Sequence, residues 1–200
     1  MTRSLRALLA ALFTLSGAGV GAQALPLKLE PIKASEHVYY FQGEAGMASS
    51  ANRAFNSNAA FVVTTDGVVV FDALGTPALG SAMKAAIAQV TRQPIRLVVV
   101  SHFHADHFYG LQALAEPGVE VWAHARGREA LGSPFTQERL EQRRRDLWPD
   151  VDQDTRLVGA TRWLEFADRK DVAFERGGVR FRLIDVSGTM VGTHRPSPSP

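Results

Sequence analysis

Residues 101–110, SHFHADHFYG, follow directly on the apolar run IRLVVV at residues 95–100. They place three of the chain's six histidines and one aspartate within six consecutive positions. The aliphatic run before them predicts a strand buried on both faces, as in parallel sheets. Open α/β sheets bind their ligands where such strands end, so we expect a functional site in this segment.

The residue types in this segment favour a metal site. His102 and His104 are two positions apart and share a side if strand geometry persists, while Asp106 and His107 approach from the following turn. The chain has no cysteine, so imidazole nitrogen and carboxylate oxygen are the available ligands. This donor set suits zinc, with iron or manganese as alternatives. A purely structural cluster is the other interpretation, but it would carry the cost of crowding several imidazoles together.

The first 24 residues have the layout of an export signal. Arg3 and Arg6 precede the short apolar run ALLAALFTL, and the segment ends in small residues spaced Ala22-x-Ala24. This pattern predicts a signal peptide over residues 1–24, cleaved after Ala24, and a periplasmic or secreted mature protein. A buried N-terminal helix is the alternative. No stretch of the sequence reaches the roughly 20 apolar residues that span a bilayer.

Charge and length narrow the function classes. The formal net charge is +2, and residues 1–24 hold two of the 22 basic side chains and none of the 20 acidic ones. The mature chain is therefore formally neutral and lacks the basic footprint of a nucleic-acid-binding protein. A small molecule remains as the expected partner, and nothing in the sequence indicates an oligomeric state. Two hundred residues with 46% hydrophobic content allow one domain with a real core.

The hydrophobic pattern predicts an α/β protein in which strands and helices alternate. Thr76 is the expected N-cap of the first helix, with Pro77 at its first position. Leu79, Met83 and Ile87 share one face of this helix, with Val90 on the same face, and should pack in the core. The predicted strands cover residues 36–44, 59–74 with a turn at 65–67, 94–103, 119–125, 162–167 and 171–186 with a turn at 177–178, and the helices cover 75–92 and 136–148.

The run HFHADH at residues 102–107 is similar to the H-x-H-x-D-H signature of the metallo-β-lactamase superfamily. The resemblance extends from about His37 to Asp185 and includes the paired strands that end at Asp72. It implies a four-layer αββα sandwich, here incomplete and mainly its N-terminal half. Within the superfamily the chain most resembles exported zinc metallohydrolases of the quinoprotein-relay type, near lactonase and glyoxalase relatives.

The resemblance also implies roles for single residues. His102 and His104 become ligands of a first zinc ion, and Asp106 and His107 become ligands of a second. Asp72 would lie beneath the site and fix its loop, although a plain turn carboxylate at a strand end is the alternative. The implied reaction is hydrolysis of a lactam, lactone or thioester carbonyl by a metal-bound hydroxide. Asp106 would be the catalytic residue that orients the hydroxide and takes up its proton.

The later ligands of the superfamily pattern are not evident. That pattern contains a third histidine, a bridging aspartate and a last histidine. His124 could border the pocket, but a lone surface histidine is the favoured interpretation. After it the sequence has a single histidine, His194, and Asp185 precedes that residue. We therefore expect residues 25–186 to form the N-terminal part of the domain. Residues 187–200 would be a disordered tail that stands in, by truncation or frameshift, for the missing metal loop.

Two functions follow from this pattern. The first is a zinc-dependent hydrolase with one or two ions. The alternative is a truncated, catalytically inactive member that at most binds metal weakly, because two ligands for each ion are fewer than zinc usually has.

Overall fold

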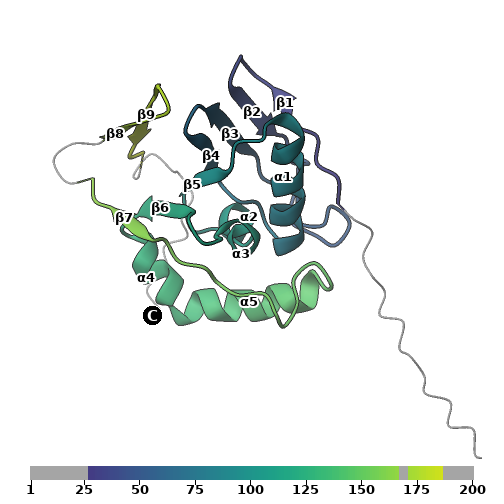
Figure 1. Cartoon of the computed structure of the whole chain (residues 1–200). Helices are drawn as coiled ribbons and strands as arrows, with labels where there is room; N and C mark the ends of the chain where they lie inside the picture. The colour runs from purple at the N-terminus through teal and green to yellow at the C-terminus, as the bar shows by residue number, and fades with distance from the viewer. Residues whose placement is uncertain (1–26, 167–170, 187–200) are drawn as a thin grey trace, which may run out of the picture.

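The computed structural model describes residues 27–166 and 171–186. The predictions for residues 1–24 and 187–200 lie outside this part of the chain. One sheet contains seven strands in the order β1-β2-β3-β4-β5-β6-β7, and two further strands, β8 and β9, form a separate hairpin (Figure 1).

The elements alternate along the chain as the sequence predicted. The strands are β1 Ile32–Lys33, β2 Val38–Phe41, β3 Ala59–Thr64, β4 Gly67–Phe71, β5 Ile95–Val100, β6 Glu120–His124, β7 Arg162–Leu164, β8 Asp171–Arg176 and β9 Val179–Ile184. The helices are α1 Pro77–Val90, α2 Ala105–Phe108, α3 Leu111–Leu114, α4 Gly127–Gly132 and α5 Pro134–Asp146. The short elements β1, α2, α3 and α4 were not predicted.

The first four strands of the sheet are antiparallel, and the turn between β3 and β4 is where the sequence placed it. Thr64 lies opposite Gly67, and the Thr64 hydroxyl donates to the carbonyl oxygen of Gly67 over 2.7 Å. Gly67 has a φ of +100°, and a Cβ there would lie 2.8 Å from the carbonyl oxygen of Pro94. Only glycine fits this position without strain.

The strands from β4 to β7 are parallel, and the central ones are buried on both faces. Val68, Val70, Val98 and Val100 belong to a large apolar core on one face. The residues between them face the other side, because successive side chains of a strand alternate. The second cluster consists of Val69, Leu97, Val99, Trp122 and Leu164.

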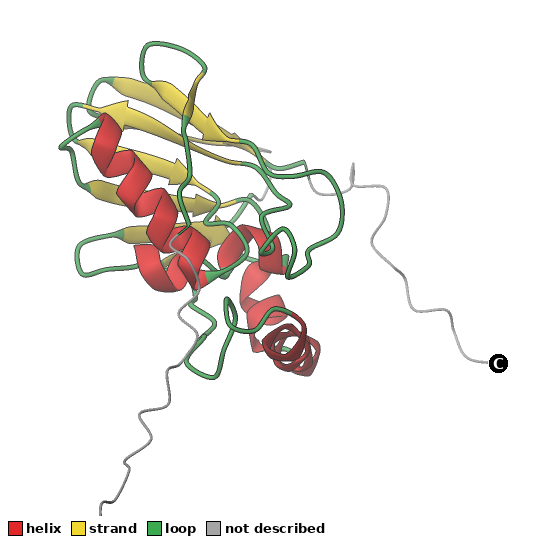
Figure 2. Ribbon diagram, turned by 90° about the vertical axis from the view of Figure 1, so that its right-hand side faces the viewer, coloured by secondary structure: helices red, strands yellow, loops and turns green. Residues whose placement is uncertain are grey.

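Helix α1 covers the first face of the sheet (Figure 2). The Thr76 hydroxyl accepts a hydrogen bond from the backbone N–H of Leu79 over 3.0 Å, and Pro77 opens the helix. Leu79, Met83 and Ile87 are buried in the core, as the helical spacing predicted. Helix α3 packs beside α1 on the same face.

The β8–β9 hairpin supplies apolar side chains to the second face. Phe174, Phe181 and Leu183 pack against the second cluster, and the rings of Phe174 and Phe181 stack with centroids 4.8 Å apart. Arg176 anchors the turn end of the hairpin through a 2.8 Å bond to Glu120. The layers are therefore helices, the main sheet and a hairpin, which is a part of the expected sandwich.

No helix within residues 27–166 and 171–186 is both long enough and apolar enough to cross a bilayer.

Candidate metal centre

The predicted ligands lie at the carboxyl ends of the central strands β4 and β5. The two strands are parallel with Phe71 opposite Val99, so the segments that leave them begin side by side. The backbone N–H of Asp72 donates to the carbonyl oxygen of Val99 over 2.9 Å and holds them together. Residues 101–104 then lead from β5 into α2, which carries Asp106 and His107. The structure thus brings the four predicted ligands together at the carboxyl ends of these strands.

The carboxylate of Asp72 joins the two segments. Its Oδ1 accepts the backbone N–H of Ser101 at 2.7 Å. Its Oδ2 accepts both the hydroxyl of Ser101 and Nδ1 of His107, each at 2.8 Å. Asp72 is 8% exposed and has a φ of +61°, a left-handed conformation that costs energy and is typical of functional sites. These contacts place Asp72 beneath the site, and a plain turn carboxylate does not account for them.

The same hydrogen bonds determine which imidazole nitrogens are free. An ionised carboxylate only accepts, so Nδ1 of His107 carries a proton, and in the neutral ring Nε2 keeps its lone pair. Ser101 donates its hydroxyl proton to Asp72, so its oxygen accepts from Nδ1 of His102, 2.9 Å away. Nε2 of His102 is therefore unprotonated in the neutral ring, and it is within hydrogen-bond distance of Nδ1 of His104. Asp72 fixes one tautomer directly and the other through Ser101.

Nε2 of His102 and Nε2 of His107 each face a second atom that could bind the same metal ion. Nε2 of His102 lies 3.1 Å from Nδ1 of His104, and we call these two residues the first donor pair. Nε2 of His107 lies 3.6 Å from Oδ2 of Asp106, and these form the second donor pair. Two ligands of one tetrahedral zinc ion, each 2.0–2.2 Å from it, lie about 3.4 Å apart. Both pairs are close to that separation.

The surroundings shift the pKa of two of these histidines in opposite directions. Burial lowers the pKa of His102, and the neighbouring His107 and His104 lower it further, which favours the neutral ring. Burial also acts to lower the pKa of His107, but the hydrogen bond and charge of Asp72 and the charge of Asp106 together raise it. Metal ligands must be unprotonated, so a metal ion would compete with a proton at His107.

Zinc sites usually have three or four protein ligands. Within the described ranges, no three His, Cys, Asp or Glu side chains form a group able to hold a metal ion. The two donor pairs match zinc in atom type and in spacing, but each supplies only two ligands.

A cavity of about 830 Å³ opens beside the first donor pair. His124, at the end of β6, and Asp185, after β9, line it together with both histidines of that pair. Nδ1 of His124 accepts the backbone N–H of Arg126 at 3.0 Å, and its Nε2 lies 3.9 Å from Asp185. The ring stacks on Phe166 at a centroid distance of 5.2 Å. The side chain of His124 is 26% exposed and forms part of the cavity wall, so the structure favours the alternative that His124 borders the pocket.

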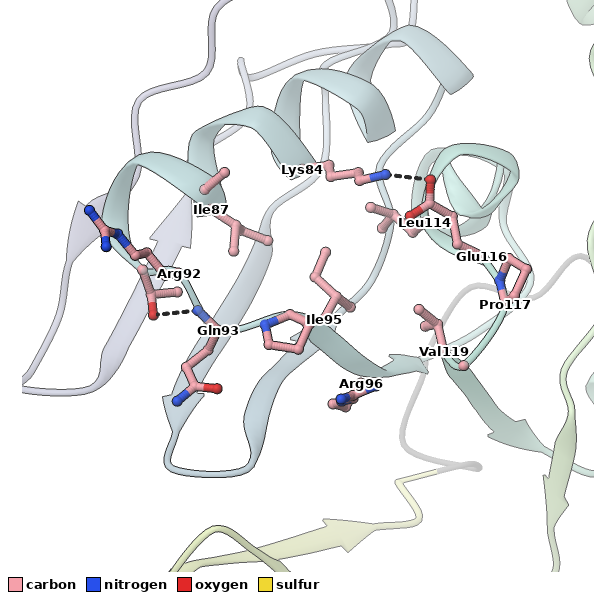
Figure 3. Close-up of a pocket in the computed structure, with 14 residues that line it drawn as sticks. Lys84, Ile87, Arg92, Gln93, Ile95, Arg96, Leu114, Glu116, Pro117 and Val119 are labelled. Atoms are coloured by element: carbon pink, nitrogen blue, oxygen red, sulfur yellow. Dashed lines mark hydrogen bonds and ion pairs between the residues drawn. The ribbon is translucent and has the colours of Figure 1, made fainter.

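A second pocket of about 510 Å³ surrounds the start of β5, at the end opposite the site (Figure 3). Lys84 of α1 and Glu116 form an ion pair across it. It shares no lining residue with the first cavity.

Sequence reasoning missed three side chains that contact the site. Nδ2 of Asn56 donates to Oδ2 of Asp106 over 3.2 Å, and the hydroxyl of Ser57 donates to the backbone carbonyl of Asp106. Both lie between β2 and β3, about 50 positions from Asp106, and nothing in a single sequence links them. Ser101 is the third, and its hydroxyl next to His102 was a signal that could have been used.

Comparison with known proteins identifies the family and the fold. The protein-family model described as "Metallo-beta-lactamase superfamily" matches residues 52–200 of the chain. The chain therefore belongs to the metallo-beta-lactamase superfamily. Comparison with curated proteins gave no match.

Solved structures with the same fold include a metallo-beta-lactamase from Pontibacter korlensis, with 17% identity and a TM-score of 0.54 over 76% of this chain and 58% of that one. A stereoselective inverting sec-alkylsulfatase from Pseudomonas sp. has 20% identity and a TM-score of 0.57, over 78% and 27% of the two chains. A metallo-beta-lactamase from Pseudomonas aeruginosa in its mono-zinc form has 16% identity and a TM-score of 0.52, over 73% and 54%. The present chain thus spans between about a quarter and three fifths of these proteins.

Proposed function

We propose that the protein is a zinc-dependent hydrolase that cleaves the carbonyl group of a lactam, lactone or thioester. The observation that carries this proposal is the position of Asp72. Its hydrogen bonds leave Nε2 of His102 and Nε2 of His107 unprotonated in the neutral rings, and each of these nitrogens faces a second potential metal ligand. Membership of the superfamily supports it. The donor atoms are those that zinc prefers, and iron or manganese would be the alternatives.

In this proposal, different residues bind the metal ions, accept the proton and receive the substrate. The first donor pair would hold one ion and the second donor pair another. Bound zinc would lower the pKa of a water molecule and polarise the substrate carbonyl. Asp106 would orient the attacking water and take up its proton, because its carboxylate lies at the site and its Oδ2 faces His107. The cavity beside His102 and His104 would receive the substrate.

The second candidate is a catalytically inactive member that at most binds metal weakly. The observation that favours it is the number of ligands, two in each pair. Such pairs would bind an ion less tightly than a complete site of three or four.

Hydrolysis assays separate the two functions. The 200-residue chain, loaded with zinc, is assayed against a lactone, a thioester and a β-lactam, beside the His104→Ala variant and the metal-free protein. The hydrolase proposal expects turnover that requires zinc and is lost in His104→Ala. Zinc binding without turnover of any of the three would contradict the hydrolase and favour the inactive member.

A further inference from the structure

We propose that Asn56 is a positioning residue for the second donor pair, which holds the Asp106 carboxylate in the orientation where Oδ2 faces His107. This inference rests on the proposed function. The Asn56 amide donates from Nδ2 to Oδ2 of Asp106 at 3.2 Å, and the same oxygen lies 3.6 Å from Nε2 of His107. One carboxylate oxygen thus meets the amide and the free imidazole nitrogen together.

The backbone around Asn56 is held on both sides, on one by a bond to the site and on the other by a bond to the segment after α5. The hydroxyl of the next residue, Ser57, donates to the backbone carbonyl of Asp106. On the other side, Arg53 donates from Nε and Nη2 to the two carboxylate oxygens of Asp150, at 2.9 and 2.5 Å. Paired hydrogen bonds of this kind fix geometry as well as adding energy. The segment between β2 and β3 therefore presents the Asn56 amide to Asp106 from a defined position.

The amide oxygen Oδ1 of Asn56 gives a second indication of the role of this side chain. Its Oδ1 is buried and has no hydrogen-bond partner within the described residues. A buried acceptor without a partner opposes folding, so stability alone does not explain an asparagine here. The contact that the side chain does make is the one from Nδ2 to Asp106.

The carboxylate of Asp106 needs such a contact. A carboxylate can rotate about its terminal bond, and only some orientations direct a lone pair of Oδ2 to the point that Nε2 of His107 also faces. A donor on Oδ2 restricts that rotation. Oxygen lone pairs remain for a metal ion, because a carboxylate offers about four such sites. Loss of a partner that orients a ligand typically lowers metal affinity about 10–100-fold.

Asn58 provides a matched control. It lies in the same segment, and its Oδ1 accepts the backbone N–H of Gly43 at 3.0 Å. Asn58→Ala therefore removes an asparagine side chain and one hydrogen bond of this segment without removing a bond to Asp106.

The test measures zinc affinity by competition with a fluorescent chelator. We expect Asn56→Ala to weaken zinc binding about 10–100-fold, and Asn58→Ala to leave it nearly unchanged. In an Asp106→Ala background, Asn56→Ala should have no further effect, because the amide acts through that carboxylate. Equal affinities in the two asparagine variants, or an undiminished effect of Asn56→Ala without Asp106, would overturn the proposal. Thermal unfolding of each variant checks that it folds.

A second measurement needs no metal. The side-chain amide resonances of Asn56 and Asn58 are assigned by NMR in the zinc-free chain and compared with those of Asp106→Ala. The Asn56 resonance should move and the Asn58 resonance should stay. An unmoved Asn56 resonance would overturn the positioning role whatever the zinc result. A chain that binds no zinc but shows the shift would contradict the proposed function and leave the Asn56–Asp106 contact established.

Discussion

Nδ1 of His107 donates to Oδ2 of Asp72 over 2.8 Å and joins two residues that are 35 positions apart. The same oxygen accepts a hydrogen bond from the hydroxyl of Ser101, whose oxygen in turn accepts one from Nδ1 of His102. One carboxylate thereby sets the tautomer of a histidine in each donor pair. The orientation of the imidazole rings in the H-x-H-x-D-H segment therefore depends on Asp72, which follows a different strand, β4.

Replacing Asp72 should therefore damage both folding and metal binding. Asp72→Ala leaves the N–H and hydroxyl of Ser101 and Nδ1 of His107 without their acceptor. Ser101 is exposed, so water can replace the acceptor of its two donors, whereas the His107 side chain is only 19% exposed and its Nδ1 is less readily hydrated. We expect the free energy of unfolding in urea to fall by about 1–3 kcal/mol. Zinc affinity should fall about 10–100-fold, because the imidazoles lose their fixed tautomers.

Asp66→Ala is the control for that variant. Asp66 is 69% exposed at the β3–β4 turn, and its oxygen lies 3.8 Å from Arg176. Exposed ion pairs contribute about 0–1 kcal/mol, so Asp66→Ala should change stability little and zinc affinity not at all. Similar losses in both variants would show that Asp72 has no special role.

The contact between α3 and the segment after β4 predicts a steric effect at Gly110. A Cβ at this position would lie 1.9 Å from the carbonyl oxygen of Ala73, the neighbour of Asp72. Gly110→Ala should lower the free energy of unfolding by about 1–3 kcal/mol, as overpacking does. It should also weaken zinc binding, because the backbone beside Asp72 has to move.

Gly132→Ala is the matched substitution, since a Cβ there meets nothing within 4 Å. Its effect on the free energy of unfolding should stay within about 0.5 kcal/mol. Urea unfolding of the two variants makes the comparison, and an equally tolerated alanine at both positions would contradict the packing described here.

The N-terminal pattern predicts export. When the full chain is produced in a bacterium, we expect it in the periplasm with residues 1–24 removed. Intact mass of the recovered protein should place its first residue at Leu25. Cytoplasmic recovery with Met1 retained would refute this expectation.

The sequence predicted the main elements because their signals are local. Alternation and β-branched runs located β3 to β6, and the hydroxyl of Thr76 followed by Pro77 located the start of α1. The donor residues were evident because all four lie within six positions. These features depend on neighbours in the chain, and a single sequence contains them.

Other parts of the site depend on contacts between distant segments. Asn56 reaches Asp106 only because the segment after β2 folds over the end of β5, and no spacing in the sequence indicates this. The place of His124 in the cavity wall was not evident, because its neighbour Asp185, 3.9 Å away, follows β9 much later in the chain. The short helices α2 and α3 contain four residues each, too few for a helical period to be evident.

Zinc content tests the central claim most directly. The purified chain, the His102→Ala/His104→Ala double variant and the His37→Ala variant are loaded with zinc, dialysed and measured by elemental analysis. His37 is 57% exposed and contacts Glu36 rather than the site, so it controls for the loss of a histidine. We predict that the parent and His37→Ala retain equal amounts of zinc, below one ion per chain, and that the double variant retains less, because only the second donor pair is left. Equal zinc in all three proteins would contradict the assignment of the site.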